Sequence, residues 1–342
     1  MSTVDWPDVL TRLVRGQDLD DGITAAVMTA VMSGDATAVQ IAGFLMSLRA
    51  KGETAGEIAG LVRGMREFAL PLDAPAHVVD TCGTGGDRAG TFNVSTVSAV
   101  VAAAAGATVA KHGNRAASGR CGSADLLEAW GVVIDLPPAG VSRCIDEIGI
   151  GFCFAPTFHP AMRYAGPARR ELGVPTVFNF LGPLTNPAGA RHQTIGVSDP
   201  GMAPKMAQVL AQLGTAHAFV FHGEDGLDEL TTTSGSTLWE VRDGDVERRR
   251  FDPADLGIPR ATLDQLKGGG VEDNVRIANA VLDGQPGAPR DIVVLGAAAA
   301  LVAADRVGDW DAGLAASREA IDSGRGRDLV GRWVAMSQTM AR

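Results

Sequence analysis

Three short polar stretches of this chain carry residue types that could hold a phosphorylated molecule. The first is GTGGDRAGTFNVST at residues 83–96, which follows the strand-like HVVDTC. A glycine-rich turn without a ligand is one interpretation, because the stretch lacks the lysine and spacing of a P-loop and does not fit GxGxxG. We favour an anion site, since a helix beginning near Val94 would present free amides to an anion. Four polar side chains lie in or near this helix start: Asp87, Asn93, Ser95 and Thr96.

The second stretch, KHGNRAASGRCGSAD at residues 111–125, concentrates positive charge. Within ten residues of an acidic chain it places Lys111, His112, Arg115 and Arg120. A solvated loop would also have this composition. The position of the cluster beside a helix start at Ser123 instead favours a clamp on a polyphosphate.

The third stretch, HGEDGLDELT at residues 222–231, contains the adjacent carboxylates Asp228 and Glu229. Such a pair commonly belongs to a solvated turn. In a protein that also offers phosphate-binding stretches, the pair favours Mg²⁺, which takes oxygen ligands and reaches substrate phosphates through a few carboxylates and waters.

The elements that must position these stretches fall into two regions. Residues 1 to about 70 show helical periodicity with no strand run. We expect Asp35 to cap the helix that follows it, and Thr54 with Glu57 to form a capping box.

From His77 onwards, short β-rich runs alternate with helical ones. The expected strands are residues 77–82, 107–113, 132–136, 151–156, 191–198 and 216–223. This alternation predicts a mostly parallel sheet covered by helices, with ligands at the carboxyl ends of the strands, where all three polar stretches fall. We therefore predict a small all-helical lobe at residues 1–73, joined by a second segment near residues 159–185, and a larger α/β domain at residues 74–342.

Composition limits the class of protein. The formal charge is −10 and the pI is about 5.1, which argues against a general nucleic-acid binder. The cysteines show no CxxC spacing for zinc or a redox pair, and scattered thiols suit a reducing cytoplasm. The N-terminus lacks a signal-peptide pattern, and the longest apolar runs are too short to span a bilayer. We expect a cytoplasmic protein with no membrane partner.

Seven motifs together resemble the anthranilate phosphoribosyltransferase family, in order and over nearly the whole chain. They are GTGGD at 83–87, TFNVST at 91–96, KHGNR at 111–115, GSADLLEAWGV at 122–132, HPAMRYAGPARRELG at 159–173, FNFLGPLTNP at 178–187 and DGLDEL at 225–230. The resemblance implies a nucleoside phosphorylase/phosphoribosyltransferase-like fold and a homodimer joined through the helical lobes. It also implies phosphoribosyl pyrophosphate as donor, bound with Mg²⁺, and anthranilate as acceptor.

The resemblance carries site residues onto this sequence position by position. The donor-binding positions are Gly83, Gly86, Asp87, Thr91, Asn93, Ser95, Thr96, Lys111 and Ser123. The implied metal ligands are Ser95, Asp228 and Glu229. The positions implied to contact anthranilate are Gly83, Asn114, His159, Arg169 and Gly182. The chain departs from the family pattern at Arg120 and Cys121, where lysine and serine are frequent, and at Gly296, where asparagine is common.

The implied chemistry agrees with these residue types. Attack of an amine at ribose C1 expels pyrophosphate, so the main need is to stabilise charge on the leaving group. We assign this catalytic role to Lys111, Asp228 and Glu229. An aromatic amine is unprotonated at neutral pH, so no strong general base is required. Arg169 would hold the anthranilate carboxylate through its guanidinium fork.

Two alternatives remain at this point. A pyrimidine nucleoside phosphorylase-like enzyme would combine a similar glycine-rich loop with a lysine motif. A non-enzymatic nucleic-acid-binding relative would keep the fold, but its expected basic surface conflicts with the net charge of −10.

Overall fold

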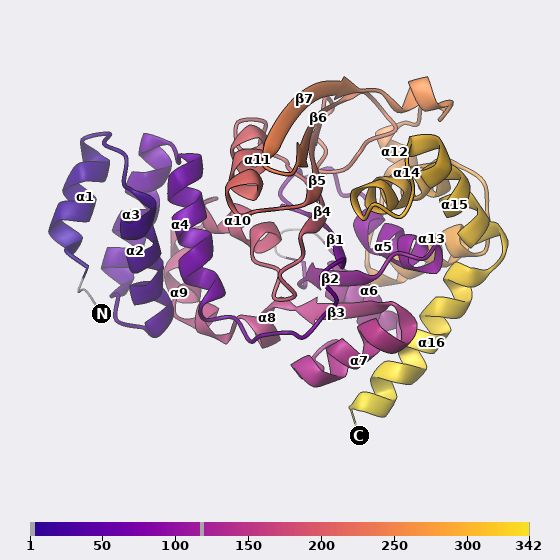
Figure 1. Ribbon diagram of the computed structural model, residues 1–342, viewed down its shortest axis with the longest axis horizontal. Coiled ribbons are helices and arrows are strands. Elements are labelled where there is room, and N and C mark those ends of the chain that lie inside the picture. The colour runs from indigo at the N-terminus through magenta and orange to yellow at the C-terminus, as the bar shows by residue number, and fades with distance from the viewer. Residues whose placement is uncertain (1–3, 117–119, 342) are drawn as a thin grey trace.

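The protein, seen in a computed structural model that describes residues 4–116 and 120–341, consists of a helical lobe and a larger α/β lobe (Figure 1). This architecture confirms the predicted fold class. The N-terminal helices are α1 Trp6–Val14, α2 Asp21–Ser33, α3 Ala38–Lys51 and α4 Ala55–Arg66. Among the described residues, none of the helices has the length and apolar character needed to cross a membrane.

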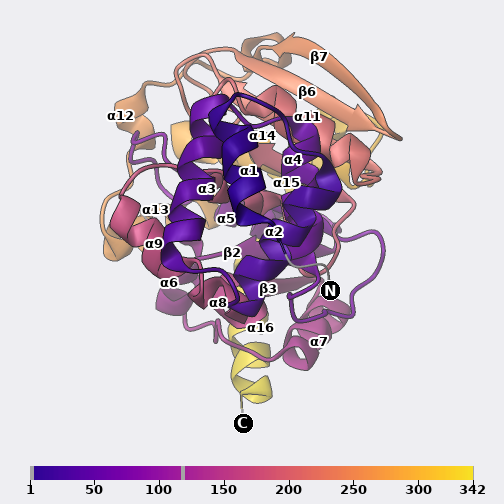
Figure 2. The same cartoon turned by 90° about the vertical axis from the view of Figure 1, so that its left-hand side faces the viewer.

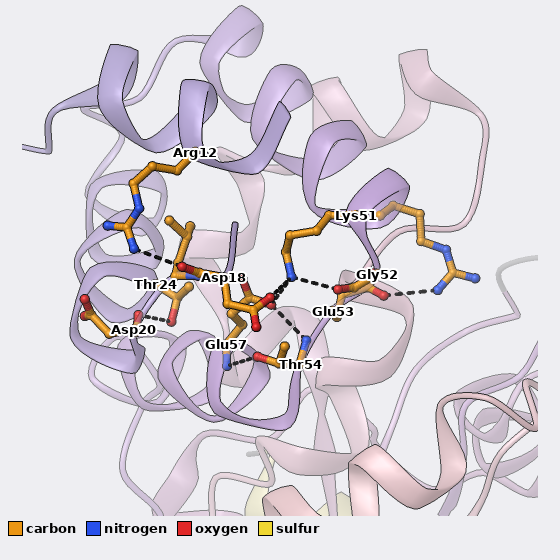
Figure 3. A network of polar contacts seen from close by, with 11 residues as sticks. Arg12, Asp18, Asp20, Thr24, Lys51, Gly52, Glu53, Thr54 and Glu57 are labelled. Atoms are coloured by element: carbon orange, nitrogen blue, oxygen red, sulfur yellow. Dashed lines mark hydrogen bonds and ion pairs between the residues drawn. The ribbon is translucent and has the colours of Figure 1, made fainter. Parts of the chain in front are cut away.

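Local capping determines where several of these helices begin. Thr54 and Glu57 form the predicted capping box at the start of α4. The Glu57 carboxylate also accepts hydrogen bonds from Leu19 N and Lys51 Nζ, both at 2.9 Å. Figure 3 shows Lys51 beside Glu57. Glu57 is fully buried, so these donors offset the cost of removing its charge from water. One side chain thus ties together three segments of the helical lobe.

The α/β lobe is built on one seven-stranded sheet with the order β3-β2-β1-β4-β5-β6-β7. The first five strands are parallel, and the last two add an antiparallel edge. The strands are β1 Val79–Gly83, β2 Val109–Gly113, β3 Ile150–Phe154, β4 His192–Gly196, β5 His217–Gly223, β6 Ser236–Arg242 and β7 Asp245–Phe251.

Side chains of the sheet alternate between two hydrophobic cores, as the twofold period of a strand requires. On β5, Phe219 and Phe221 join the core on one face, whereas Ala218 and Val220 join the core on the other. The second face is covered by the helical lobe and α11 Ala203–Gln212. The first face is covered by α5 Val94–Ala104, α6 Ser123–Trp130, α7 Pro138–Ile148, η3 Pro253–Leu256, α12 Leu263–Leu266, α13 Val271–Leu282, α14 Ala288–Ala303, α15 Trp310–Asp322 and α16 Arg325–Met340.

Residues that follow β3 return to the helical lobe. Ala168 on α9, and Phe178 and Phe180 on α10, are buried in the same core as α2, α3 and α4. In Figure 1, α10 lies between these helices and the sheet. The elements of this segment are α8 Ala155–Phe158, η1 Pro160–Arg163, α9 Gly166–Leu172, α10 Phe178–Leu181 and η2 Gly182–Leu184.

Two local predictions are wrong. Residues 132–136 are not a strand: they link α6 to α7, and Val133 N donates to Ser337 Oγ on α16 instead of to a neighbouring strand. The run is apolar because it is buried against helices. Asp35 does not cap α3, since Thr37 is the N-cap and the Asp35 carboxylate accepts from Ser33 Oγ at 2.8 Å.

Candidate active site

The order in which strands are added to the sheet reverses between β1 and β4. The chain runs outward from β1 to β2 and β3, and then returns to β4 on the other side of β1. The helix that follows β1, α5, covers one face, and the helix that follows β4, α11, covers the other. The loops at these two strand ends therefore diverge, which is where open α/β sheets place their ligands.

The loop after β5 packs directly onto the ends of β1 and β4. Gly85 N donates to Asp228 Oδ2 at 2.6 Å. A Cβ on Gly83 would come within 2.5 Å of the same carboxylate oxygen, and a Cβ on Gly196 within 1.7 Å of the Asp228 backbone oxygen. Only glycine at both strand ends permits this approach, so the first and third polar stretches lie against each other.

The loop after β1 has an unusual backbone. Gly85, Gly86 and Gly90 have φ values of 69°, 89° and 69°, and the non-glycine Arg88 has a φ of 59°. Glycine adopts this left-handed region at little cost, whereas Arg88 is strained there. The far end of the loop is anchored where Thr91 forms an isolated antiparallel β-bridge with Lys267. The loop thus holds the amides of its glycine run in one defined arrangement.

Helix α5 begins at the base of this loop without a side-chain cap. Asn93 occupies the N-cap, but its Nδ2 donates to Cys121 O at 3.1 Å and makes no bond to its own helix. The backbone amide of Ser95 lies close enough to the Glu229 carboxylate to oppose the rise in its pKa. Thr96 Oγ1 is buried and has no hydrogen-bond partner among the described residues. The first turn of α5 therefore presents polar groups beside the acidic pair.

Lys111 lies on β2 beneath the loop and is only 2% exposed. Its Nζ donates to Thr81 O at 2.6 Å and to Ser95 Oγ at 3.3 Å. Burial lowers the pKa of Lys111, while the charges of Asp80 and Glu229 oppose that shift. The lysine is a buried internal cation and not the open clamp that the sequence suggested.

Three carboxyl groups gather above Lys111. Burial raises the pKa of Asp228 to about 7, and the neighbouring Asp87 contributes to that rise. Burial, followed by the charge of Asp228, raises the pKa of Glu229 well above its usual value. Asp87 Oδ2 is buried with no hydrogen-bond partner in the described chain. Uncompensated carboxyl oxygens of this kind suit a hard divalent cation such as Mg²⁺.

Protein side chains do not complete a metal site on their own. Within residues 4–116 and 120–341, no group of three or more His, Cys, Asp or Glu side chains is arranged to hold a metal ion. Mg²⁺ usually keeps waters and binds through one or two carboxylates together with substrate phosphates. The donor set of Ser95, Asp228 and Glu229 fits that mode.

A second cluster of polar groups lies between β2 and the segment that returns to the helical lobe. The rings of His112 and His159 are 5.1 Å apart, and His112 Nδ1 lies 3.1 Å from Gly182 O. Burial lowers the pKa of His112 to about 3 and that of His159 to about 4, so both rings are neutral. The Nε2 atoms of both rings are buried without a partner among the described residues.

Arg169 lies on α9, beside this segment. Its guanidinium carbon is 5.0 Å from the centre of the Phe178 ring, and burial lowers its pKa. In the part of the chain that the structure describes, Arg169 makes no ion pair. The adjacent Arg170 is exposed. Arg169 is therefore the half-buried cation of the two, and Phe178 holds it in place.

In the basic loop after β2, two of the expected cations are not available to bind a polyphosphate. Arg115 forms ion pairs with Asp125 and Glu128, and His112 is neutral. Asn114 is exposed directly after β2, and Ser123 Oγ at the start of α6 donates to Asn114 O at 3.1 Å. Arg120 is exposed as well. Residues 117–119 of this stretch lie outside the described residues.

Sequence reasoning missed one residue of the site, Asp80, and misjudged the charge of another, His112. Asp80 is fully buried on β1, and its Oδ1 accepts from His112 N at 3.1 Å. A carboxylate inside an apolar strand run was a usable signal, because such a group needs a buried partner. His112 was noticed only as a cation, and its neutral state follows from burial that the sequence does not show.

Comparisons with known proteins agree with this geometry. Two family models match: "Glycosyl transferase family, a/b domain" at residues 75–327 and "Glycosyl transferase family, helical bundle domain" at residues 7–69. The chain is 53% identical over 340 residues to the anthranilate phosphoribosyltransferase of Nocardioides sp., covering 98% of this chain and 99% of that relative. The crystal structure of anthranilate phosphoribosyltransferase from Thermus thermophilus has a TM-score of 0.92 at 45% identity, covering 97% of this chain and 99% of that one. The Saccharomyces cerevisiae anthranilate phosphoribosyltransferase in complex with PRPP and Mg has a TM-score of 0.90 at 25% identity, covering 99% of both chains.

Proposed function

Because the chain belongs to the anthranilate phosphoribosyltransferase family, we propose that it transfers the 5-phosphoribosyl group from phosphoribosyl pyrophosphate to the amine of anthranilate. The products are N-(5-phosphoribosyl)anthranilate and pyrophosphate, and the reaction belongs to tryptophan biosynthesis. The observation that best supports this function is the hydrogen bond from Gly85 N to the Asp228 carboxylate, at the place where the strand order of the sheet reverses. It puts an acidic pair, a glycine-rich loop and a helix N-terminus in one place. The relatives favour this reading over the phosphorylase and nucleic-acid-binding alternatives.

The donor half of the site is assigned to the loop after β1 and the first turn of α5. The exposed Gly86 and the hydroxyl of Thr96 supply hydrogen-bond donors for phosphate oxygens. Thr91 and Asn93 lie at the far end of the same loop, and Ser123 borders the neighbouring loop after β2. Lys111 positions Ser95 through its hydrogen bond and places a positive charge beneath the acidic pair.

Mg²⁺ is the cofactor that fits the acidic pair. Ser95, Asp228 and Glu229 would hold it, and Asp87 lies beside them. When bound, Mg²⁺ neutralises charge on the pyrophosphate leaving group, which is the largest electrostatic need of the reaction.

The acceptor half is assigned to the cluster around His159. The anthranilate carboxylate matches the planar guanidinium of Arg169, whose position over Phe178 leaves its N–H groups for a bidentate contact. A Cβ placed on Gly182 would have no neighbouring atom within 4 Å, so there is room beside this residue for the flat ring of anthranilate. As the amine nitrogen bonds to ribose C1, the bond from C1 to the pyrophosphate oxygen breaks, and the amine then loses a proton.

We also propose a homodimer joined through the helical lobes. Val39 and Met46 on α3 are seven residues apart and share one side of that helix, with exposed fractions of 82% and 40%. Val14 on the adjacent α1 is 76% exposed. Figure 2 shows α1 and α3 on the outer side of this lobe. An apolar surface of this kind supports an interface with a second copy, and sedimentation of wild type against Val39→Asp tests it.

The free cysteines support a cytoplasmic location. The activity itself is tested by following the loss of anthranilate fluorescence with phosphoribosyl pyrophosphate, with and without Mg²⁺. We expect loss only when donor and metal are both present. Phosphorolysis of a pyrimidine nucleoside without that loss would contradict the assignment.

A further inference from the structure

The loop after β4 holds the glycine-rich loop through one serine. Ser198 Oγ donates to Gly85 O at 2.7 Å, and Ser198 N donates to Thr84 Oγ1 at 3.1 Å. Thr84 N donates to Gly196 O at 2.9 Å, which continues the pairing of β1 with β4 beyond the strand ends. These bonds connect two loops that are separated by more than a hundred residues.

The bond from Ser198 fixes one peptide plane. In a trans peptide the C=O and the following N–H point in opposite directions, and the described residues contain no cis peptide bonds. Because Gly85 O points toward Ser198, the N–H of Gly86 points away from Ser198. Gly85 and Gly86 both have positive φ, and a peptide between two glycines is free to turn over unless another group holds it.

Both sides of Gly85 are therefore held by side chains from later parts of the chain. Its N–H is bound by Asp228, and its C=O accepts from Ser198 Oγ at 2.7 Å and also, at the longer distance of 3.2 Å, from the neighbouring Thr84 Oγ1. Gly86 N has no hydrogen-bond partner among the described residues and is left available to a ligand. The Gly86 amide is thus one of the free amides of the loop, and it is the one whose peptide plane Ser198 holds.

Ser198 is itself held from the helical lobe. The next residue, Asp199, accepts from Arg49 Nη2 on α3 at 3.0 Å, and Arg49 also pairs with the buried Glu53 at 3.3 Å. The side chain of Asp199 also accepts from Gly201 N at 2.9 Å, which closes the turn before α11. The β4 loop is therefore anchored directly after Ser198, at Asp199.

We propose that Ser198 is a positioning residue for the donor: its hydroxyl holds the Gly85–Gly86 peptide so that the Gly86 N–H faces the pyrophosphate group. This inference rests on the proposed function for the identity of the donor. The ligand class is a pyrophosphate ester, and Ser198 acts on it only through Gly86.

The test compares Ser198→Ala with Ser198→Thr, which keeps a hydroxyl. Binding of pyrophosphate with Mg²⁺ is measured by calorimetry on the full chain, and Michaelis constants are measured for both substrates. Loss of one oriented hydrogen bond predicts a roughly three- to tenfold rise in Kd for pyrophosphate and in KM for the donor in Ser198→Ala. The anthranilate KM should change less than about twofold, and Ser198→Thr should bind pyrophosphate within about twofold of wild type.

The matched control is Ser142→Ala. Ser142 Oγ on α7 donates to Asp73 O at 2.5 Å, so this variant loses a hydroxyl-to-carbonyl bond of the same kind without any contact to the glycine-rich loop. Unchanged pyrophosphate affinity in Ser198→Ala, equal losses for both substrates, or equal losses in the alanine and threonine variants would overturn the proposal. If wild type binds pyrophosphate but does not consume anthranilate, the proposed function fails, and the calorimetric comparison still decides the role of Ser198.

Discussion

The Asp228 carboxylate accepts a hydrogen bond from the Gly85 amide at 2.6 Å, although the two residues are 143 positions apart. This contact joins a metal-binding candidate to the loop that would hold the donor phosphates. It also explains why the acidic turn is buried, since it fills the space that two glycines leave at the ends of β1 and β4.

The acidic pair is expected to be essential. The double variant Asp228→Ala/Glu229→Ala should lower kcat/KM by at least about a hundredfold, the scale for losing a main stabiliser of transition-state charge. The matched control is Asp146→Ala/Glu147→Ala, an adjacent pair of the same residues on α7, whose turnover should stay near wild type. Steady-state rates across Mg²⁺ concentrations check this, and near-normal turnover by a folded double variant would place the metal elsewhere.

Arg169 and Arg170 should behave differently. Arg169→Ala removes a charge-assisted contact of about 1.5–3 kcal/mol, so the KM for anthranilate should rise roughly ten- to a hundredfold, with little change for the donor. The exposed Arg170→Ala is the neighbouring control and should change neither constant by much. Small, equal effects of both variants on both substrates would show that Arg169 is an ordinary surface residue with no role in binding anthranilate.

Gly196 should tolerate no side chain. A Cβ there would lie 1.7 Å from a backbone oxygen of Asp228, which has no rotamer with which to move aside. Gly196→Ala should therefore lower the free energy of unfolding by about 1–3 kcal/mol and weaken donor binding. Gly331→Ala, in the interior of α16 with nothing within 4 Å, should instead raise that free energy by about 0.5–1 kcal/mol. Urea unfolding measures both, and a Gly196→Ala protein as stable as wild type would show that the acidic turn moves freely.

Neutral His112 predicts a pH dependence of stability. The folded ring has a pKa of about 3, whereas the unfolded ring takes up a proton near pH 6.5, so acidification favours the unfolded chain. The contribution is fully present above about pH 6.5 and is lost as the pH falls toward the folded pKa. Wild type should lose about 2 kcal/mol more than His112→Gln between pH 7 and pH 5.

Urea unfolding at a series of pH values measures this difference. His77→Gln, which removes an exposed ring, is the control and should follow wild type. Parallel stability curves for wild type and His112→Gln would mean that the folded ring takes up its proton in the same range as the unfolded one.

Local patterns in the sequence determined much of the fold. The capping box of Thr54 and Glu57 was predicted correctly, because a capping box depends only on two residues that are three positions apart in the sequence. Alternating runs predicted the parallel sheet, and the helix at Val94 begins where expected. The strand predicted at residues 132–136 was wrong. A segment buried against a helix such as α16 contains the same apolar residues as a segment buried in a sheet, so the pattern does not distinguish them.

Only the tertiary structure decided how the polar groups meet. The sequence identified Lys111, Asp228 and Glu229 by residue type, but their burial and the resulting pKa shifts arise from packing between distant strands. No sequence signal marked Ser198, because its contact with Gly85 depends on the register of β1 against β4. Residue type and spacing specify local capping and the chemistry that a site can perform. Distances between segments that are far apart in the chain are set by the folded sheet, and therefore so are the charge states and the direction of each amide.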